Sequence, residues 1–322
     1  MNNILTKSGK VSAIFACVLL LVVSASAQIS LRKALDTDAD GKADFTVFRE
    51  SNNFWYINKS GGGFTFQQFG SSNTDYQTPG DYDGDGKGDI SVWRSTDGGW
   101  YRLNSSNNTF TGVAFGVDGD EPVARDYDGD GKTDQAVVRR SGGSMTWFVL
   151  RSLTGALQVA QFGLATDFVA PGDYDGDLKF DFAVQRIGAN PTDQGNFYIL
   201  QSLTNSLSTI PWGASNDFVV PGDYDGDGKT DVAVVREGTT PDSPRNWYIR
   251  RSSNGNLQAV AFGTSGTDLN VQNDYDGDGK TDVAVWRDTN GYFYYLRSLD
   301  GGFVSVQWGA TSDFPVASYD TH

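Results

Sequence analysis

Short apolar stretches alternate with polar, glycine-rich segments along nearly all of the chain beyond residue 35. One apolar stretch ends in arginine, as in FTVFR at 45, and an aromatic stretch follows, as in FWYI at 54. A third stretch ends in an aromatic residue and a glycine, as in Phe69-Gly70. Short runs of β-branched and aromatic residues between turn residues predict β-strands, and no helical periodicity competes with them. The pattern therefore predicts an all-β chain.

The same unit recurs six times, with starts at residues 36, 81, 126, 173, 223 and 274. About four strands per unit indicate the blades of a β-propeller, because a β-helix needs much shorter coils and a leucine-rich repeat would show a leucine ladder. The chain ends in DFPVASYD at 313, which resembles the segment DFVVPGDYD at 217. We expect this terminal strand to complete the first blade, because an open ring leaves unpaired sheet edges. The prediction is six four-stranded blades closed by N- and C-terminal strands, with seven blades as the alternative.

A nine-residue acidic loop opens every unit, with aspartate at positions 1, 3, 5 and 9 and lysine at position 7. Carboxylates this close repel one another without a cation, and Ca²⁺ accepts such a flexible set of oxygen ligands more readily than Mg²⁺ does. We expect the aspartate side chains and the main-chain carbonyl of the lysine to bind Ca²⁺, up to six ions in all. The candidate ligands are Asp36, Asp38, Asp40, Lys42, Asp44, Asp81, Asp83, Asp85, Lys87, Asp89, Asp126, Asp128, Asp130, Lys132, Asp134, Asp173, Asp175, Asp177, Lys179, Asp181, Asp223, Asp225, Asp227, Lys229, Asp231, Asp274, Asp276, Asp278, Lys280 and Asp282.

The loops differ from EF-hands, because position 12 is valine in all six and strands rather than helices flank them. Acidic turns without a metal are the alternative interpretation. In the fourth loop Leu178 replaces the glycine of position 6, and a turn that favours positive φ strains a leucine by roughly 1 kcal/mol. We expect the site from Asp173 to Asp181 to be the weakest. The first loop has Thr37 and Ala39 in place of tyrosine and glycine but keeps all four aspartates, so we expect it to bind.

The DxDGDGxxD loops together with the aromatic-glycine pairs resemble the FG-GAP and VCBS repeats, the family that includes the N-terminal propeller of integrin α-chains. The resemblance runs from about Asp36 to Tyr319. It implies Ca²⁺ bound between neighbouring strands of a blade, and a role in adhesion or carbohydrate recognition. Only the metal ligands carry over residue by residue, because partner-binding positions in this family have no fixed motif.

The first 27 residues have the layout of a signal peptide. Lys7 and Lys10 precede an apolar run over residues 11–23, and small residues follow before Gln28. The run is shorter than the about 20 residues that a membrane-spanning helix needs, although a membrane anchor is the alternative. We therefore expect a secreted or periplasmic protein with no membrane span after signal cleavage.

The mature chain, residues 28–322, is expected to be a single propeller domain. It has no cysteine once Cys17 is removed, so a core or a metal must stabilise it in place of disulfides. Loss of Lys7 and Lys10 changes the formal net charge from −15 to −17. So acidic a chain is not expected to bind nucleic acid.

Catalytic chemistry has few candidate residues in this sequence, because the sole histidine is His322 and the mature chain has no cysteine. No catalytic residue is assigned, and we expect no enzyme. A recognition or adhesion module that binds an extracellular or cell-surface protein or a glycan is the preferred function. A structural scaffold of the envelope or matrix is one alternative, and a calcium-dependent enzyme that degrades polysaccharides through a carboxylate pair is another.

Recognition is expected where the units differ most. The fourth and fifth units carry longer segments at 187–196 and 237–246, which adjacent blades would present on one face, although neutral loop growth explains them equally well. The repeated tryptophans are either sugar-stacking platforms or, as we favour, core between blades. They are Trp55, Trp100, Trp147 and Trp247. We expect the repeated arginines to pair structurally with carboxylates such as Asp75 and Asp120.

Overall fold

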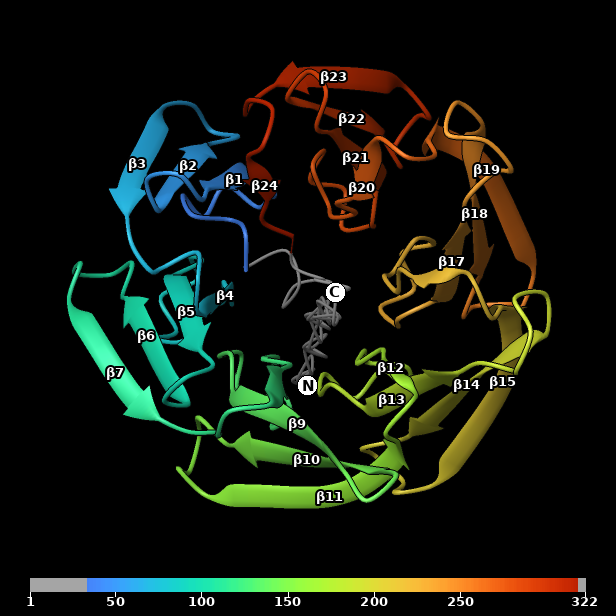
Figure 1. Cartoon of the computed structure of the whole chain (residues 1–322), viewed down its shortest axis with the longest axis horizontal. Coiled ribbons are helices and arrows are strands. Elements are labelled where there is room, and N and C mark those ends of the chain that lie inside the picture. The colour runs from blue at the N-terminus through green and yellow to red at the C-terminus, as the bar shows by residue number, and fades with distance from the viewer. Residues whose placement is uncertain (1–33, 318–322) are drawn as a thin grey trace, which may run out of the picture.

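The computed structural model describes residues 34–317, which form six four-stranded antiparallel sheets arranged as the blades of a ring (Figure 1). The predicted signal peptide and His322 lie outside the described residues. From the innermost to the outermost strand, the six blades are β24 (Phe314–Pro315), β1 (Phe45–Arg49), β2 (Phe54–Asn58) and β3 (Phe64–Gln68); β4 (Asp75–Gln77), β5 (Ile90–Arg94), β6 (Gly99–Leu103) and β7 (Phe110–Ala114); β8 (Asp120–Pro122), β9 (Gln135–Ser141), β10 (Ser144–Leu150) and β11 (Leu157–Leu164); β12 (Phe168–Val169), β13 (Phe182–Arg186), β14 (Gln194–Leu200) and β15 (Leu207–Ala214); β16 (Phe218–Val219), β17 (Val232–Arg236), β18 (Pro244–Arg250) and β19 (Leu257–Thr264); and β20 (Asp268–Asn270), β21 (Val283–Arg287), β22 (Tyr292–Leu296) and β23 (Phe303–Gln307).

The ring closes through the first blade. Strand β24, from the C-terminal end of the described chain, pairs with β1 through Val47 opposite Pro315 and Phe48 opposite Phe314. The predicted six-bladed propeller with a terminal closing strand is confirmed, and the seven-bladed alternative is wrong. The described residues contain no helix long and apolar enough to cross a membrane.

Burial falls from the second strand of each blade to the outermost strand. The second strand of a blade is buried on both faces, as in VAVVR of β17. The third strand alternates buried and half-buried residues, and the outermost strand alternates half-buried and exposed ones, as in β18 and β19. The second strand is covered by sheets on both sides, so both of its faces are apolar, while the outermost strand meets solvent.

The aromatic-glycine pairs allow neighbouring blades to come close together. Gly70 has a φ of +87°, and a Cβ added to it would lie 3.0 Å from Val92 Cγ1 of the next blade. The same contact recurs at each junction, including Gly309 against Val47 where the ring closes. Only glycine combines a positive φ with so little space, which explains why it occurs once per unit. The six junctions are Gly70–Val92, Gly116–Val137, Gly163–Val184, Gly213–Val234, Gly263–Val285 and Gly309–Val47.

The arginine that ends each second strand forms a two-pronged ion pair with a buried aspartate of the innermost strand or just before it. Arg94, for example, donates from Nε and Nη2 to Asp75 at 2.7 and 2.9 Å and lies over the ring of Tyr101. The predicted structural role of the arginines is confirmed. The six pairs are Arg49–Asp313, Arg94–Asp75, Arg139–Asp120, Arg186–Asp167, Arg236–Asp217 and Arg287–Asp268.

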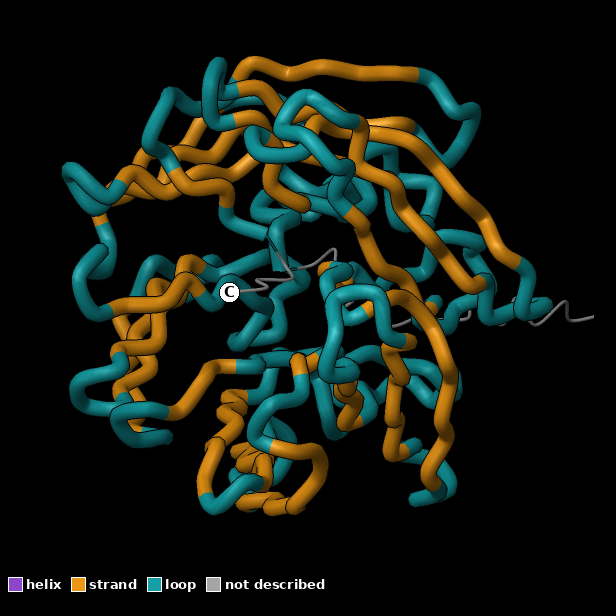
Figure 2. The backbone as a smooth tube through the Cα atoms, turned by 45° about the vertical axis from the view of Figure 1, so that its right-hand side comes forward, coloured by secondary structure: helices purple, strands orange, loops and turns teal. Residues whose placement is uncertain are grey.

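Antiparallel strands place the connections of every blade on two opposite faces (Figure 2). Connections from the first to the second strand and from the third to the fourth leave one face, here called the acidic-loop face. Connections from the second to the third strand, and from the outermost strand to the next blade, leave the other face, here called the variable face. The longer segments of the fourth and fifth units therefore lie on the variable face, opposite the acidic loops.

Candidate metal centres

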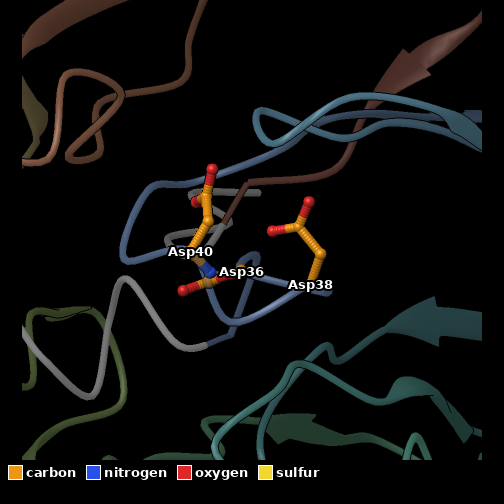
Figure 3. A group of neighbouring side chains, drawn as sticks. All are labelled: Asp36, Asp38 and Asp40. Atoms are coloured by element: carbon orange, nitrogen blue, oxygen red, sulfur yellow. Dashed lines mark hydrogen bonds between the residues drawn. The ribbon is translucent and has the colours of Figure 1, made fainter.

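Each acidic loop immediately precedes the second strand of its blade, on the acidic-loop face. In the first blade the loop carries Asp36, Asp38 and Asp40 close together (Figure 3). The aspartates of positions 1 and 9 are buried in all six loops, and those of position 3 are half-buried. The loops therefore hold several carboxylates in surroundings that water reaches poorly.

The position 1 carboxylate shapes the loop around itself. Asp81 accepts hydrogen bonds from the amides of Gly84 at 2.7 Å and Gly86 at 3.0 Å. Both glycines have positive φ, +81° and +87°, which the predicted sharp turn requires. One side chain thus folds the turn so that the carboxylates that follow point back toward it.

A second turn, between the third and fourth strands, closes over each loop. Ser105 donates from its amide to Asp89 at 2.7 Å and from Oγ to Asp85 at 2.9 Å, and the Ser106 hydroxyl donates to Asp83 at 2.6 Å. This serine was not predicted from the sequence, although it follows the aromatic strand in every unit. Its six copies are Ser60, Ser105, Ser152, Ser202, Ser252 and Ser298.

The carboxylates of one loop come near enough to share a cation. Oxygens of the aspartates at positions 1, 3 and 5 lie within 4.8 Å of one another in the first two loops, and those at positions 1, 3 and 9 do so in the next three. In three loops Oδ1 of the position 3 aspartate is buried without a hydrogen-bond partner among the described residues: Asp38, Asp128 and Asp175. A cation can satisfy a buried carboxylate oxygen that has no donor, so the residues fit a hard metal ion.

Burial also raises the pKa of these carboxyl groups. Desolvation is the main cause; the neighbouring aspartates add to it, and backbone hydrogen bonds partly oppose it. The pKa rises to about 7 at Asp126 and Asp223 in position 1 and at Asp181 and Asp282 in position 9. Carboxylates that resist ionisation in this way favour either a bound proton or a bound cation.

The six loops are hydrogen-bonded to one another around the ring. The amide of position 8 donates to the carbonyl oxygen of position 1 in the preceding loop, as Thr133 donates to Asp81 at 2.7 Å. The side chain of Lys132 lies against Gly84 of that preceding loop, and its Nζ donates to the carbonyl of Asp83 at 3.1 Å. The lysine side chain thus joins neighbouring loops, whereas its main-chain carbonyl as a metal ligand stays a prediction.

The fourth loop keeps the geometry of the others despite its different sequence. Leu178 takes a φ of +71°, and its amide still donates to Asp173 Oδ2 at 2.9 Å. Phe180, at position 8, is buried against Tyr127 of the third unit. The first loop has a comparable residue, because Ala39 takes a φ of +63° where the other loops have glycine. Both loops hold their carboxylates in place at the expense of backbone strain.

Residues 36–92, from the first acidic loop to the start of β5, match the family model of the FG-GAP-like repeat. The chain carries an FG-GAP-like repeat. The other five units share its acidic loop and its strand order, so the repeat describes the architecture of the whole ring. No curated protein sequence matches the chain at a significant level.

Solved structures share the propeller fold at low sequence identity. TolB from Acinetobacter baumannii is 16% identical with a TM-score of 0.55; the match covers 85% of this chain and 63% of TolB, less than two thirds of its length. A lectin from Agrocybe aegerita that recognises non-reducing terminal N-acetylglucosamine is 15% identical with a TM-score of 0.52, and the match covers 83% of this chain and 89% of the lectin. An oligogalacturonate lyase in complex with manganese is 11% identical with a TM-score of 0.48, over 80% of this chain and 74% of the lyase. Likenesses at these identities establish the fold alone.

Proposed function

We propose that this chain is an exported calcium-binding propeller that acts as a recognition module for a glycan or a cell-surface protein. The observation that carries the metal assignment is the buried Oδ1 of Asp38, Asp128 and Asp175, which no donor satisfies within loops already rich in carboxylates. Export rests on the signal-peptide layout of residues 1–27. Calcium is the preferred ion because the ligands are oxygens from a flexible loop, and extracellular calcium is abundant enough to saturate weak sites.

Four aspartates in each FG-GAP-like loop would hold the ion, at positions 1, 3, 5 and 9. The ion would supply positive charge and so stabilise the ionised carboxylates, which burial destabilises. The loop, the serine turn and the preceding loop would then be fixed together, since hydrogen bonds already connect all three. A ring fixed in this way presents the opposite face on a rigid support, which reduces the entropy lost when a partner binds.

The longer segments on the variable face support a recognition role, because they are anchored rather than free. In the fourth blade the Gly188 amide donates to Ser215 Oγ at 2.8 Å, and the Ser215 amide donates to the Asp193 carbonyl at 3.0 Å. Ser265 makes the same pair of bonds with Gly238 and Ser243 in the fifth blade. Ordered loops of unequal length on a rigid ring are a common place for binding residues.

A glycan array read in calcium and in EDTA tests this function. Glycans are the first class to test because a lectin is among the similar folds and because calcium-stabilised loops tolerate the extracellular environment. Binding to a defined set of glycans in calcium, lost in EDTA, supports the proposal. Binding to cell-surface proteins in a parallel pull-down, without glycan binding, keeps the recognition role and replaces the ligand class. A protein that binds neither is a structural scaffold, and the recognition role is then wrong.

A further inference from the structure

The repeated tryptophans do not offer a sugar-binding surface, because Trp55, Trp100, Trp147 and Trp247 are at most 2% exposed and belong to the core. A different repeated position is exposed on the variable face. It is the residue after the aspartate that pairs with arginine, on the innermost strand, where Tyr76, Phe168 and Phe218 are 40 to 43% exposed. Blade packing does not require an aromatic residue there, since the third blade has Glu121 at this position.

Two cavities open beside Phe168 and Phe218. One, of about 560 Å³, lies between Thr166, Phe168 and Asn216, and the other, of about 680 Å³, lies between Leu269, Asn270 and Thr289. Phe218 lines both, so the two cavities meet at its ring. Each has the size of a small-molecule site, and together they form a groove over the innermost strands of the fourth, fifth and sixth blades.

The larger cavity also contains a buried cation with a spare donor. Arg245, at the end of the longer segment of the fifth blade where β18 begins, is 4% exposed. Its Nη1 donates to the carbonyl of Asp268 and to Asn270 Oδ1, and its Nη2 donates to Glu237 at 3.1 Å. Its Nε has no hydrogen-bond partner among residues 34–317. A buried N–H without an acceptor is costly to leave so, and a ligand oxygen would satisfy it once the guanidinium, which lies over the ring of Phe218, shifts toward the cavity.

The charges around the larger cavity exclude an acidic ligand. Asp268 and Asp313 are neutralised by Arg287 and Arg49, and Glu237 by Arg245. Two further carboxylates, Glu50 and Asp288, line the cavity without a cation paired to them in the described structure. Carboxylates accept hydrogen bonds from hydroxyl groups, whereas they repel uronate, sulfate or phosphate groups.

We propose that the groove on either side of Phe218 binds a neutral oligosaccharide, with sugar rings on Phe218 and Phe168, an acceptor oxygen at Arg245 Nε, and hydroxyls donating to Glu50 and Asp288. This inference rests on the proposed recognition function and names its site. Aromatic faces, carboxylates and a guanidinium arranged around one groove match the apolar faces and the hydroxyl edges of a sugar ring.

The test uses the mature chain in calcium and three series of fluorescent probes: cello-oligosaccharides, chito-oligosaccharides and oligogalacturonates. The variant Phe218→Ala should weaken binding of a neutral series about tenfold or more at every chain length. Phe168→Ala should weaken tetrasaccharides more than disaccharides, because Phe168 lines only the smaller cavity, whereas Phe218 lines both. Phe110→Ala is the matched control, since Phe110 is 63% exposed on an outermost strand. Thermal melts verify that all variants are folded.

Loss of neutral-sugar binding in Phe218→Ala but not in Phe110→Ala supports the inference. Equal binding by the wild type and Phe218→Ala would show that the ligand binds at another site, which overturns the inference. The proposed recognition function would still stand. Preference for oligogalacturonates overturns the assignment of a neutral ligand. If the wild type binds none of the three series, the site assignment is wrong, and only the wider array decides the proposed function.

Discussion

The six units are nearly identical on one face of the propeller and differ from one another on the other face. On the acidic-loop face the six units repeat the same aspartates, the same serine turn and the same hydrogen bond to the preceding loop. On the variable face the connections differ in length, and the exposed inner-strand position varies from Phe218 to Glu121. Repetition on one face reflects a requirement that every blade shares, whereas divergence on the other leaves residues available for a partner.

If the proposed recognition function holds, this difference separates stability and recognition between two parts of one ring. The acidic-loop face carries buried carboxylates that a cation or a proton would stabilise, so stability should respond to metal and pH there. The variable face carries the two larger cavities and the exposed aromatic residues of the innermost strands, so changes there should affect binding and leave folding largely intact. The predictions below test this separation.

Removal of calcium should have the largest effect. A site held at one hundred times its dissociation constant adds about 2.7 kcal/mol, so a few occupied loops rival the ~5–15 kcal/mol of a typical domain. Calorimetric melts in EDTA should fall by many degrees relative to calcium, and magnesium should restore little of the difference. Superimposable melts from protein verified to be free of metal contradict a metal role for the loops.

The pH dependence of stability should change sign with calcium. Without metal, the raised pKa values of the loop aspartates, up to about 7 at Asp126 and Asp282, mean that the folded state holds protons more tightly than the unfolded chain. This contribution is present below pH 4 and is lost as the pH rises through about 7. In EDTA, urea unfolding should therefore give a lower free energy of unfolding at pH 8 than at pH 5. In calcium the order should reverse, because protons compete with the ion; the same order in both buffers contradicts this account.

The substitution Leu178→Gly should stabilise the chain by about 1 kcal/mol, because it removes a positive φ from a leucine. It should also tighten calcium binding in the fourth loop, which isothermal titration can resolve. The mirror substitution Gly279→Leu is the control, since Gly279 has a φ of +87° and no atom within 4 Å of an added Cβ. It should destabilise by a similar amount, and two changes of the same sign refute the strain argument.

Shortening both longer segments should have the smallest effect on stability. Residues 187–193 can be replaced by the four-residue connection 95–98 of the second blade, and residues 238–243 by 96–98, so that the ion pair between Glu237 and Arg245 is kept. The melting temperature should stay nearly unchanged, because these residues lie outside the core. Binding of any partner found by array or pull-down should be lost; retained binding would place the site away from these segments.

Much of the fold could be predicted because the same sequence pattern occurs six times in the chain. The strand order, the terminal closing strand, the acidic loops and the arginine-aspartate pairs all follow from patterns within one unit. The contacts between units could not be predicted, because they depend on the spacing of blades in the closed ring. Gly70 against Val92 and Lys132 against Gly84 are examples. The serine turn was recognisable in retrospect, since Ser105 has a counterpart in every unit.

The candidate recognition site was less predictable than the metal centres. The sequence favoured a core role for the tryptophans over sugar platforms, and their burial confirms it, but the sequence did not single out the exposed Phe168 and Phe218. The tryptophans and the two phenylalanines occur in similar apolar strands. They differ in exposure because their strands lie at different positions relative to the axis. Arg245 likewise resembles the neighbouring polar residues in sequence, and its burial in a cavity emerges only from the packing of adjacent blades.

The number of calcium ions bound per chain tests the central claim most directly. Equilibrium dialysis of the mature protein at pH 8 in millimolar calcium, followed by elemental analysis, should give six ions per chain. When the calcium concentration is lowered, the fourth loop, Asp173 to Asp181, should lose its ion first. A chain that binds no calcium contradicts the account. So does a chain that still binds one calcium ion after the aspartates of all six loops are replaced by asparagine.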